Sequence, residues 1–334
     1  MKLGFKASAE QFAPGELLEY AVLAEDLGLD SVWISDHFQP WRHTGGHAAF
    51  SLSWLGALGA RTRRVIIGTS VLTPTFRYHP SIVAQAFATL GSLFPDRVVL
   101  GAGTGESLNE VPASGVKWPE QKERTARFRE AIRLIKTLWS GDRVSFEGDF
   151  YKTELATIYD RPAKPVPIYI AGAGPFMAKL AGLEGDGFIC TSGKKWELYT
   201  ETLLPNLDAG LEASGRSKPA DYGRMIELKV SFDTDLGRAL EDTRYWGALA
   251  LTADEKMNIE DPLQLERLAD SLPVERAASR WIVTNDAAEM IERIGAYIEL
   301  GFNHLVFHAP GKDQARFLQL FAKHVAPGLR RRFG

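Results

Sequence analysis

Short apolar segments alternate with longer segments of helical periodicity along most of the chain. Eight segments of four to seven residues are rich in Val, Ile, Leu and Phe, and most stay apolar nearly throughout. Strands that are buried on both faces of a parallel sheet show this pattern. The predicted strands span residues 3–7, 31–35, 65–71, 98–101, 168–171, 187–191, 226–232 and 304–308.

The segments between these strands favour amphipathic helices. Within residues 16–27, Leu17, Ala21 and Ala24 fall on one stripe of a helix. Residues 119–140 begin on a proline and end just before a glycine, the usual signals for a helix start and a helix end. Residues 289–300 and 314–321 complete the set of helices predicted between the strands.

Eight βα repeats favour a closed (β/α)8 barrel of the α/β class over an open, doubly wound sheet. We expect a single domain over residues 1–334, because no linker, internal repeat or low-complexity tract interrupts the pattern. Two segments do not fit the simple alternation of strand and helix. Residues 144–151 alternate and turn at a glycine, which predicts a hairpin. The polar segment at about 233–280 predicts a helical insertion between strands seven and eight, at the carboxyl-terminal rim.

Composition and charge narrow the classes of function. The chain has 334 residues, 45% of them hydrophobic, and a net charge of −3, which argues against a nucleic-acid-binding surface. Cys190 is the only cysteine, so neither an internal disulfide nor a thiolate metal cluster is expected. No apolar stretch reaches the ~18 residues of a membrane span, and the first residues lack a signal-peptide pattern. We therefore expect a cytoplasmic protein without a membrane partner.

Candidate chemistry gathers at the predicted carboxyl ends of the strands, where barrels carry their active sites. The polar and glycine-rich turns at these ends contain Asp36, His37, Ser70, Thr73, Thr104, Gly105, Glu106, Asn109, Ala173, Gly174 and Thr191. Glycines in such turns allow a flat or phosphorylated ligand to approach the backbone closely. Their location on one rim predicts a shared binding site.

His37 and Glu106 are the candidate acid/base groups of this rim. His37 can exchange a proton near neutral pH, and it follows an aspartate at a strand end. Glu106 is either a cap of the next helix or an acid/base group, and the pattern alone does not separate these readings. The sequence pattern alone predicts that Lys194, Lys256 and Arg280 are charged side chains exposed to solvent. No His/Glu spacing in the sequence predicts a metal site.

Several motifs resemble glucose-6-phosphate dehydrogenases that use the deazaflavin coenzyme F420, within the luciferase-like barrel superfamily. The matching segments are residues 3–12 (LGFKASAEQF), 35–43 (SDHFQPWRH), 68–78 (GTSVLTPTFRY), 103–106 (GTGE), 190–194 (CTSGK), 280–283 (RWIV) and 303–310 (NHLVFHAP). The QPWRH part is particularly specific within that superfamily. The resemblance extends over nearly the whole chain and implies a homodimeric TIM barrel.

The resemblance also implies roles for individual residues. It implies coenzyme F420 across the rim, in contact with Asp36, Thr73, Thr104, Gly105, Asn109, Ala173, Gly174, Phe176 and Met177. Trp41 would wall the ring, and Ser70–Val71 would form a cis peptide bond against it. The implied phosphate ligands are Thr191, Lys194, Lys256 and Arg280.

The implied reaction is hydride transfer from the anomeric carbon of glucose 6-phosphate to the coenzyme, which gives 6-phosphogluconolactone. His37 would take the hydroxyl proton and Glu106 would protonate the coenzyme, although the assignment of base and acid within this pair stays open. Met257 stands where the family usually has a histidine near the sugar, so fructose or mannose 6-phosphate remains an alternative substrate. A flavin monooxygenase and a non-catalytic sugar-phosphate or coenzyme carrier are the rival hypotheses.

Overall fold

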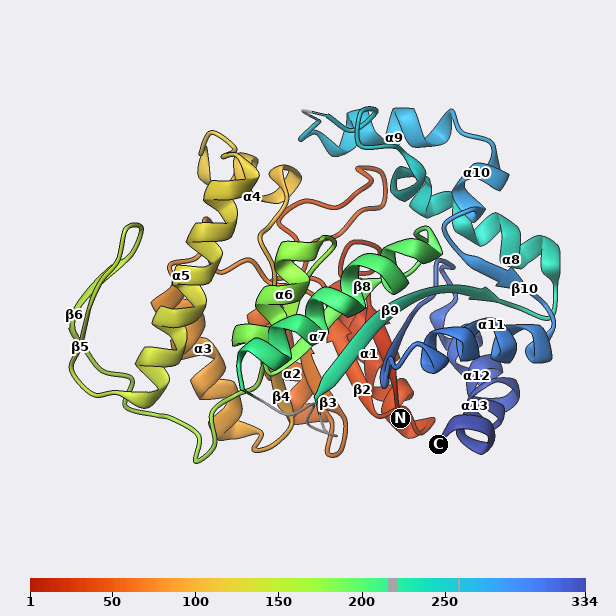
Figure 1. The fold of residues 1–334 in the computed structure, drawn as a ribbon. Helices are drawn as coiled ribbons and strands as arrows, with labels where there is room; N and C mark the ends of the chain where they lie inside the picture. The colour runs from red at the N-terminus through yellow and green to blue at the C-terminus, as the bar shows by residue number, and fades with distance from the viewer. Residues whose placement is uncertain (216–221, 258) are drawn as a thin grey trace.

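A closed barrel of parallel strands is wrapped by helices in the computed structural model of the chain, which describes residues 1–215, 222–257 and 259–334 (Figure 1). The strands are neighbours in the order β11-β1-β2-β3-β4-β7-β8, and β9 closes the ring by pairing with both β8 and β11. The barrel strands are β1 (Lys2–Ala7), β2 (Ser31–Ile34), β3 (Ile66–Thr69), β4 (Val98–Ala102), β7 (Ile168–Ala171), β8 (Gly187–Thr191), β9 (Gly223–Phe232) and β11 (His304–His308). The predicted (β/α)8 barrel is confirmed.

The apolar strands fill two layers of core. Alternate side chains point into the barrel, where Trp33, Tyr169, Met225 and neighbouring residues form an inner cluster. The other side chains point outward and pack with the helices in one large cluster, which contains Phe5 and Phe307. Both faces of each strand are therefore buried, which explains why the strands read as continuous apolar runs rather than as alternating ones.

Of the four predicted helix starts, the one at residue 314 is confirmed, while the other three helices begin at residues 14, 121 and 287 rather than at 16, 119 and 289. Helices cover the outside of the barrel. They are α1 (Pro14–Asp26), α2 (Ser51–Arg61), α3 (Pro80–Leu93), α4 (Ser107–Ser114), α5 (Gln121–Ser140), α6 (Pro175–Glu184), α7 (Leu204–Ala213), α11 (Ala287–Glu299), α12 (Gln314–His324) and α13 (Ala326–Phe333), with a π-helical turn η1 (Leu198–Leu203) before α7. Proline occupies the first turn of α1, α3 and α6, where its missing N–H costs no hydrogen bond.

Two additions to the repeat lie on opposite parts of the molecule. The predicted hairpin is present as β5 (Val144–Glu147) and β6 (Lys152–Ala156), which extend away from the barrel beside α5 (Figure 1). Between β9 and β10 lie α8 (Leu236–Asp242), η2 (Thr243–Ala250), α9 (Pro262–Asp270) and α10 (Val274–Ala278). Arg42, in the segment after β2, pairs with Asp270 of α9 at 2.6 Å, so these helices lie over the rim at which β2 ends.

Several strand predictions need correction: β9 begins at residue 223 rather than at 226, and β6, the second strand of the hairpin, lies beyond the predicted residues 144–151. A short strand β10 (Ile282–Thr284) pairs in parallel with residues 230–232 at the end of β9, and the sequence pattern did not predict it because three residues carry too little periodicity. The third strand ends at Thr69 rather than at residue 71. The Ser70–Val71 peptide bond that follows is cis, as the family resemblance implied.

Candidate active site

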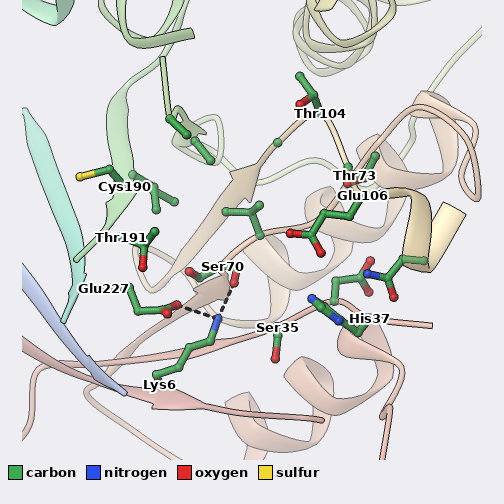
Figure 2. Close-up of a pocket in the computed structure, with 18 of the residues that line it drawn as sticks. Lys6, Ser35, His37, Ser70, Thr73, Thr104, Glu106, Cys190, Thr191 and Glu227 are labelled. Carbon is green, nitrogen blue, oxygen red and sulfur yellow. Dashed lines mark hydrogen bonds and ion pairs between the residues drawn. The ribbon is translucent and has the colours of Figure 1, made fainter. Parts of the chain in front are cut away.

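The carboxyl ends of the barrel strands surround a cavity of about 380 Å³ (Figure 2). Most of the residues predicted for the site line this cavity: Asp36, His37, Trp41, Ser70, Val71, Thr73, Thr104, Gly105, Glu106, Asn109, Ala173 and Thr191. They come from the ends of β2, β3, β4, β7 and β8. The prediction that these residues lie together on one rim of the barrel is therefore confirmed.

His37 lies between two acceptors. Its Nε2 atom is 3.4 Å from Glu10 Oε1, and its Nδ1 atom is 3.2 Å from the carbonyl oxygen of Gln39. Burial alone would raise the pKa of Glu10, but the nearby charges of His37 and Lys6 and a hydrogen bond from Ser35 hold that pKa below its usual value. The imidazole can therefore hold a proton on either nitrogen, next to an ionised carboxylate.

Glu106 occupies the cap position of α4 without acting as a cap. Its side chain makes no hydrogen bond to the backbone of the helix, and its carboxylate lines the cavity instead (Figure 2). Of the two interpretations left open by the sequence, the structure thus disfavours the cap. The ring of Trp41 lies 5.9 Å from that of His37, centroid to centroid, and forms another wall of the cavity.

Asp36 is bound by donors of the protein itself. Ser51 Oγ donates to Asp36 Oδ1 at 2.6 Å, Arg77 Nη2 donates to Oδ2 at 2.7 Å, and the Tyr78 hydroxyl also donates to the carboxylate, at 3.0 Å. Arg77 continues to Glu110 at 3.1 Å, and all three charged groups of this network are nearly fully buried. The Asp36 carboxylate therefore fixes the segment that carries His37.

Asn109 fixes the same segment from α4. Its Oδ1 atom accepts hydrogen bonds from the backbone N–H groups of Phe38, at 2.8 Å, and Gln39, at 3.2 Å. Gln39 Nε2 in turn donates to the carbonyl oxygens of Leu108 and Glu260, at 3.0 and 2.9 Å. These bonds join β2, α4 and the segment before α9, so the geometry of His37 depends on three separate parts of the chain.

Small residues shape the wall formed by β3 and β4. A Cβ atom at Gly103 would lie 2.9 Å from Val71 Cγ2, and Gly105 has a φ of +83°, which side chains rarely adopt. Lys6 Nζ donates a hydrogen bond to the carbonyl oxygen of Ser70, which holds the backbone of this wall (Figure 2). A flat ring can approach such a wall closely, which is the fit that a deazaflavin requires.

A group of charged residues deep in the cavity was not predicted. Glu227 Oε2 lies 3.1 Å from Lys6 Nζ, and Glu227 Oε1 lies 3.6 Å from Lys229 Nζ and 3.4 Å from His308 Nδ1. These residues come from β1, β9 and β11. The sequence feature that could have indicated this group is the presence of charged residues inside apolar strands. Residues 227 and 229 are two apart in a strand, so their side chains lie on the same face.

Lys194, Lys256 and Arg280 gather beside the cavity without forming its wall. Lys256 Nζ lies 5.3 Å from the centre of the Trp41 ring, and Arg280 Nη1 donates to the carbonyl oxygen of Leu249 at 3.0 Å. Both of these neighbours line the cavity. Desolvation, followed by the charges of Arg280 and Lys256, lowers the pKa of Lys194. These mutually repelling cations form a site that a dianion would stabilise.

The other three predicted coenzyme contacts lie outside the cavity. Gly174 caps α6, Met177 is 8% exposed within the large core cluster, and Phe176 is 57% exposed. Phe176 lines a second groove instead, between α5 and the β5–β6 hairpin, with a volume of about 840 Å³. The cavity thus extends to Ala173, just before the start of α6, but Gly174, Phe176 and Met177 do not line it.

No group of three or more His, Cys, Asp or Glu side chains within the described ranges has the geometry of a metal site. Among the same residues, no helix is both long and apolar enough to cross a membrane.

A parallel barrel with a polar cavity at the carboxyl ends of its strands has the architecture of a TIM-barrel enzyme. The model of the luciferase-like monooxygenase family matches residues 1–304, and the chain belongs to this family.

The chain is also similar to individual proteins over nearly its whole length. It is 62% identical over 330 residues to the F420-dependent glucose-6-phosphate dehydrogenase of Nakamurella multipartita, covering 99% of this chain and 97% of the relative. It is 63% identical over 332 residues to the protein of the same name in Beutenbergia cavernae, with 99% and 98% covered. A solved F420-dependent secondary alcohol dehydrogenase, in complex with an F420–acetone adduct, superposes with a TM-score of 0.92 at 33% identity, covering 98% of this chain and 99% of that one.

Proposed function

We propose that this chain oxidises glucose 6-phosphate to 6-phosphogluconolactone, with hydride transfer from the anomeric carbon to coenzyme F420. The observation that carries the proposal is the combination of two features in one cavity region. One is the His37 imidazole beside an ionised Glu10, and the other is the group of cations at Lys194, Lys256 and Arg280. Relatives about 60% identical over nearly their full length bear the name of this activity.

Coenzyme F420 fits the wall of small residues described above. Val71, Thr73, Gly105 and Ala173 would contact the ring, and Trp41 would face it from the segment after β2. When bound, the coenzyme accepts a hydride in the manner of a nicotinamide and does not activate oxygen. Asp36 and Asn109 support the coenzyme site through the hydrogen bonds that fix the neighbouring segment.

His37 is the group that takes the proton from the anomeric hydroxyl as the hydride leaves the same carbon. Its Nε2 atom faces Glu10, so the charge that develops on the ring is balanced by a carboxylate 3.4 Å away. Glu106 makes no hydrogen bond to its own helix and lines the cavity, and it would be the residue that passes a proton toward the coenzyme side of the site.

The phosphate of the substrate binds beside the cavity, at Lys194, Lys256, Arg280 and Thr191. Arg280 Nε is buried and finds no hydrogen-bond partner among residues 1–215, 222–257 and 259–334, so a phosphate oxygen there would satisfy it. Arginine can also offer two donors to one phosphate, which favours it over lysine at this position. Met257 follows Lys256 and is 61% exposed, and the choice among hexose phosphates is the part of the proposal that depends on it.

Two further proposals come from the family resemblance. We propose that the chain functions as a homodimer and that it acts in the cytoplasm. Light scattering coupled to size-exclusion chromatography tests the first, because a monomer of 36.9 kDa and a dimer separate clearly. Fractionation of the native cell, with the chain followed by antibody, tests the second.

A panel of hexose phosphates tests the proposed reaction. Oxidised coenzyme F420 is mixed with the protein and with glucose, fructose or mannose 6-phosphate, and the loss of the deazaflavin absorbance is followed. We expect the fastest turnover with glucose 6-phosphate and no oxygen uptake. Absence of turnover with every sugar phosphate would refute the proposal, and oxygen uptake with reduced flavin would indicate a monooxygenase instead.

A further inference from the structure

Lys229 is a buried cation to which the proposed reaction gives no role. It lies on β9, is 4% exposed and lines the cavity. Its Nζ atom donates a hydrogen bond to the Thr191 hydroxyl, and its backbone N–H donates to Ser192 Oγ at 2.8 Å. Lys229 is therefore fixed at both ends to the end of β8, which is where the phosphate is proposed to bind.

The carboxylate closest to Lys229 is shared. Glu227 Oε1 lies 3.6 Å from Lys229 Nζ, while Glu227 Oε2 lies 3.1 Å from Lys6 Nζ. His308 Nδ1 also approaches Glu227, at 3.4 Å. The Glu227 carboxylate thus serves two lysines. Lys6 also interacts with the charge of Glu10, whereas Glu227 is the one carboxylate of the described residues that pairs with Lys229.

The hydrogen bond from Lys229 orients the Thr191 hydroxyl as a donor toward the cavity. An ammonium group has no acceptor, so Thr191 Oγ1 must accept the hydrogen bond from Lys229. The hydroxyl still has its own proton to donate, and the Thr191 side chain lines the cavity (Figure 2). A hydroxyl that accepts a bond from a cation is also a stronger donor, because hydrogen bonds in a chain polarise one another.

We propose that Lys229 is a positioning residue of the sugar-phosphate site. It orients the Thr191 hydroxyl as a donor to the phosphate of the substrate and adds a fourth positive charge behind Lys194, Lys256 and Arg280. This inference rests on the proposed function, because it takes the substrate to be a phosphorylated sugar.

The electrostatics of Lys229 give the inference a measurable signature. Burial, together with the charges of Arg280, Lys194 and Lys6, lowers the pKa of Lys229 to about 8, and Glu227 opposes this shift. The groups that face it also include His308 on β11 and the Cys190 thiol on β8. Lys229 is thus mostly protonated at pH 7.5 and mostly neutral at pH 9.5. A bound dianion favours the protonated form, so substrate binding should be accompanied by proton uptake as the pH approaches 9.

The test compares the KM for glucose 6-phosphate between pH 7.5 and 9.5 in the wild type and in Lys229→Met, Lys229→Arg and Thr191→Val. At pH 7.5 we expect Lys229→Met to raise KM by about 10- to 100-fold, the size of a lost charge-assisted hydrogen bond, with a much smaller change in kcat. The wild-type KM should rise toward that of Lys229→Met by pH 9.5. Lys229→Arg should show a flatter profile, because its charge persists.

Two further measurements separate this role from a structural one. The combined Lys229→Met/Thr191→Val variant should raise KM by less than the product of the two single effects, because both changes disrupt one hydrogen bond. Lys152→Met on the exposed hairpin is the matched control, and its KM should equal that of the wild type at every pH. Retained binding of coenzyme F420, followed by fluorescence, shows that each variant is folded.

The outcomes distinguish this inference from the proposed function. If the wild type does not oxidise glucose 6-phosphate, the proposed function fails and the inference fails with it. If the wild type is active but Lys229→Met keeps its KM and its pH profile, the inference alone is wrong. Should neither Lys229 variant fold, a wild-type KM that stays constant from pH 7.5 to 9.5 would equally overturn it. A wild-type KM that rises over this range while that of Thr191→Val rises much less would support it, and equal rises in both proteins would overturn it.

Discussion

Arg280 offers the sharpest perturbation of the proposed phosphate site. Its guanidinium is half-buried, Nη1 donates to the Leu249 carbonyl at 3.0 Å, and Nε has no partner in the part of the chain that the structure describes. Burial lowers the pKa of Arg280. An arginine side chain nevertheless stays charged in proteins, so Arg280 is a cation throughout the working range. The change Arg280→Ala therefore removes one full charge and the donors of a guanidinium from the region beside the cavity.

The expected magnitude follows from the contacts that are lost. A hydrogen bond to a charged group contributes about 1.5–3 kcal/mol, and loss of one partner of a buried charge pair costs about 2–5 kcal/mol. Lys194 and Lys256 would still attract the phosphate, so we expect about 2–3 kcal/mol, which corresponds to a roughly 30- to 150-fold increase in KM. Since the hydride leaves the far end of the sugar, kcat should change much less.

The assay follows the loss of deazaflavin absorbance over a range of glucose 6-phosphate concentrations, for the wild type, Arg280→Ala and Arg280→Lys. Lysine keeps the charge but loses the planar fork, so it should give an intermediate KM. Arg161→Ala, at an exposed ion pair with Asp142, is a matched control that should leave both constants unchanged. An Arg280→Ala variant with wild-type KM would show that the phosphate binds elsewhere.

Three other predictions concern catalysis, specificity and stability. His37→Ala and Glu106→Gln should each lower kcat by about 10²- to 10⁴-fold while the fluorescence titration with coenzyme F420 stays normal, and near-native turnover in either would remove that residue from the mechanism. Met257→His should change the ratio of activities among glucose, fructose and mannose 6-phosphate in parallel assays, and an unchanged ratio would contradict its assigned influence. His304 is buried, and burial together with the charges of Lys2 and the N-terminus lowers its pKa to about 3. The His304 side chain therefore stays neutral in the folded state, whereas in the unfolded chain it gains a proton below about pH 6.5. The free energy of unfolding should therefore fall as the pH decreases through this range. Between pH 7.0 and 5.5, urea unfolding should show a decrease in this free energy that is about 1 kcal/mol greater for the wild type than for His304→Gln. Equal decreases in the two proteins would refute this assignment.

The strands of the barrel could be predicted because a strand that is buried on both faces has a nearly continuous run of apolar residues in its sequence. Six of the helices that cover them could not be placed from the pattern with equal clarity, although their starts follow ordinary rules. In α3, for example, His79 caps the helix through a contact with Ser81 N–H and Pro80 occupies its first turn. The strand β10 escaped prediction because its three residues pair only with the end of β9.

The position of the candidate acid/base residues in the cavity was predictable because they stand at strand ends, where barrel chemistry occurs. His37 and Glu106 are of this kind. Glu10 was not predicted as the partner of His37, because it follows a different strand and its distance of 3.4 Å from His37 depends on the register in which β1 pairs with β2. The group around Glu227 was missed for a related reason: charged residues within apolar strands signal an interior polar site, but which of them meet depends on the register of β1, β9 and β11.

The family resemblance supplied what local pattern could not. Lys194, Lys256 and Arg280 lie far apart in sequence and read as surface charges, yet the fold brings them close enough for Arg280 and Lys256 to lower the pKa of Lys194. Conversely, Phe176 and Met177 were implied as coenzyme contacts, and their side chains do not line the cavity. Position in a motif thus predicted the neighbourhood of these residues better than their individual contacts.

The most direct test of the account is a single turnover experiment without oxygen. The protein is mixed with stoichiometric oxidised coenzyme F420 and excess glucose 6-phosphate, and the deazaflavin absorbance and the phosphogluconolactone formed are measured together. We predict one equivalent of lactone for each equivalent of coenzyme reduced, and no comparable turnover when NADP replaces the coenzyme. Equal turnover with NADP, or coenzyme that stays oxidised while the sugar phosphate is unchanged, would contradict the account.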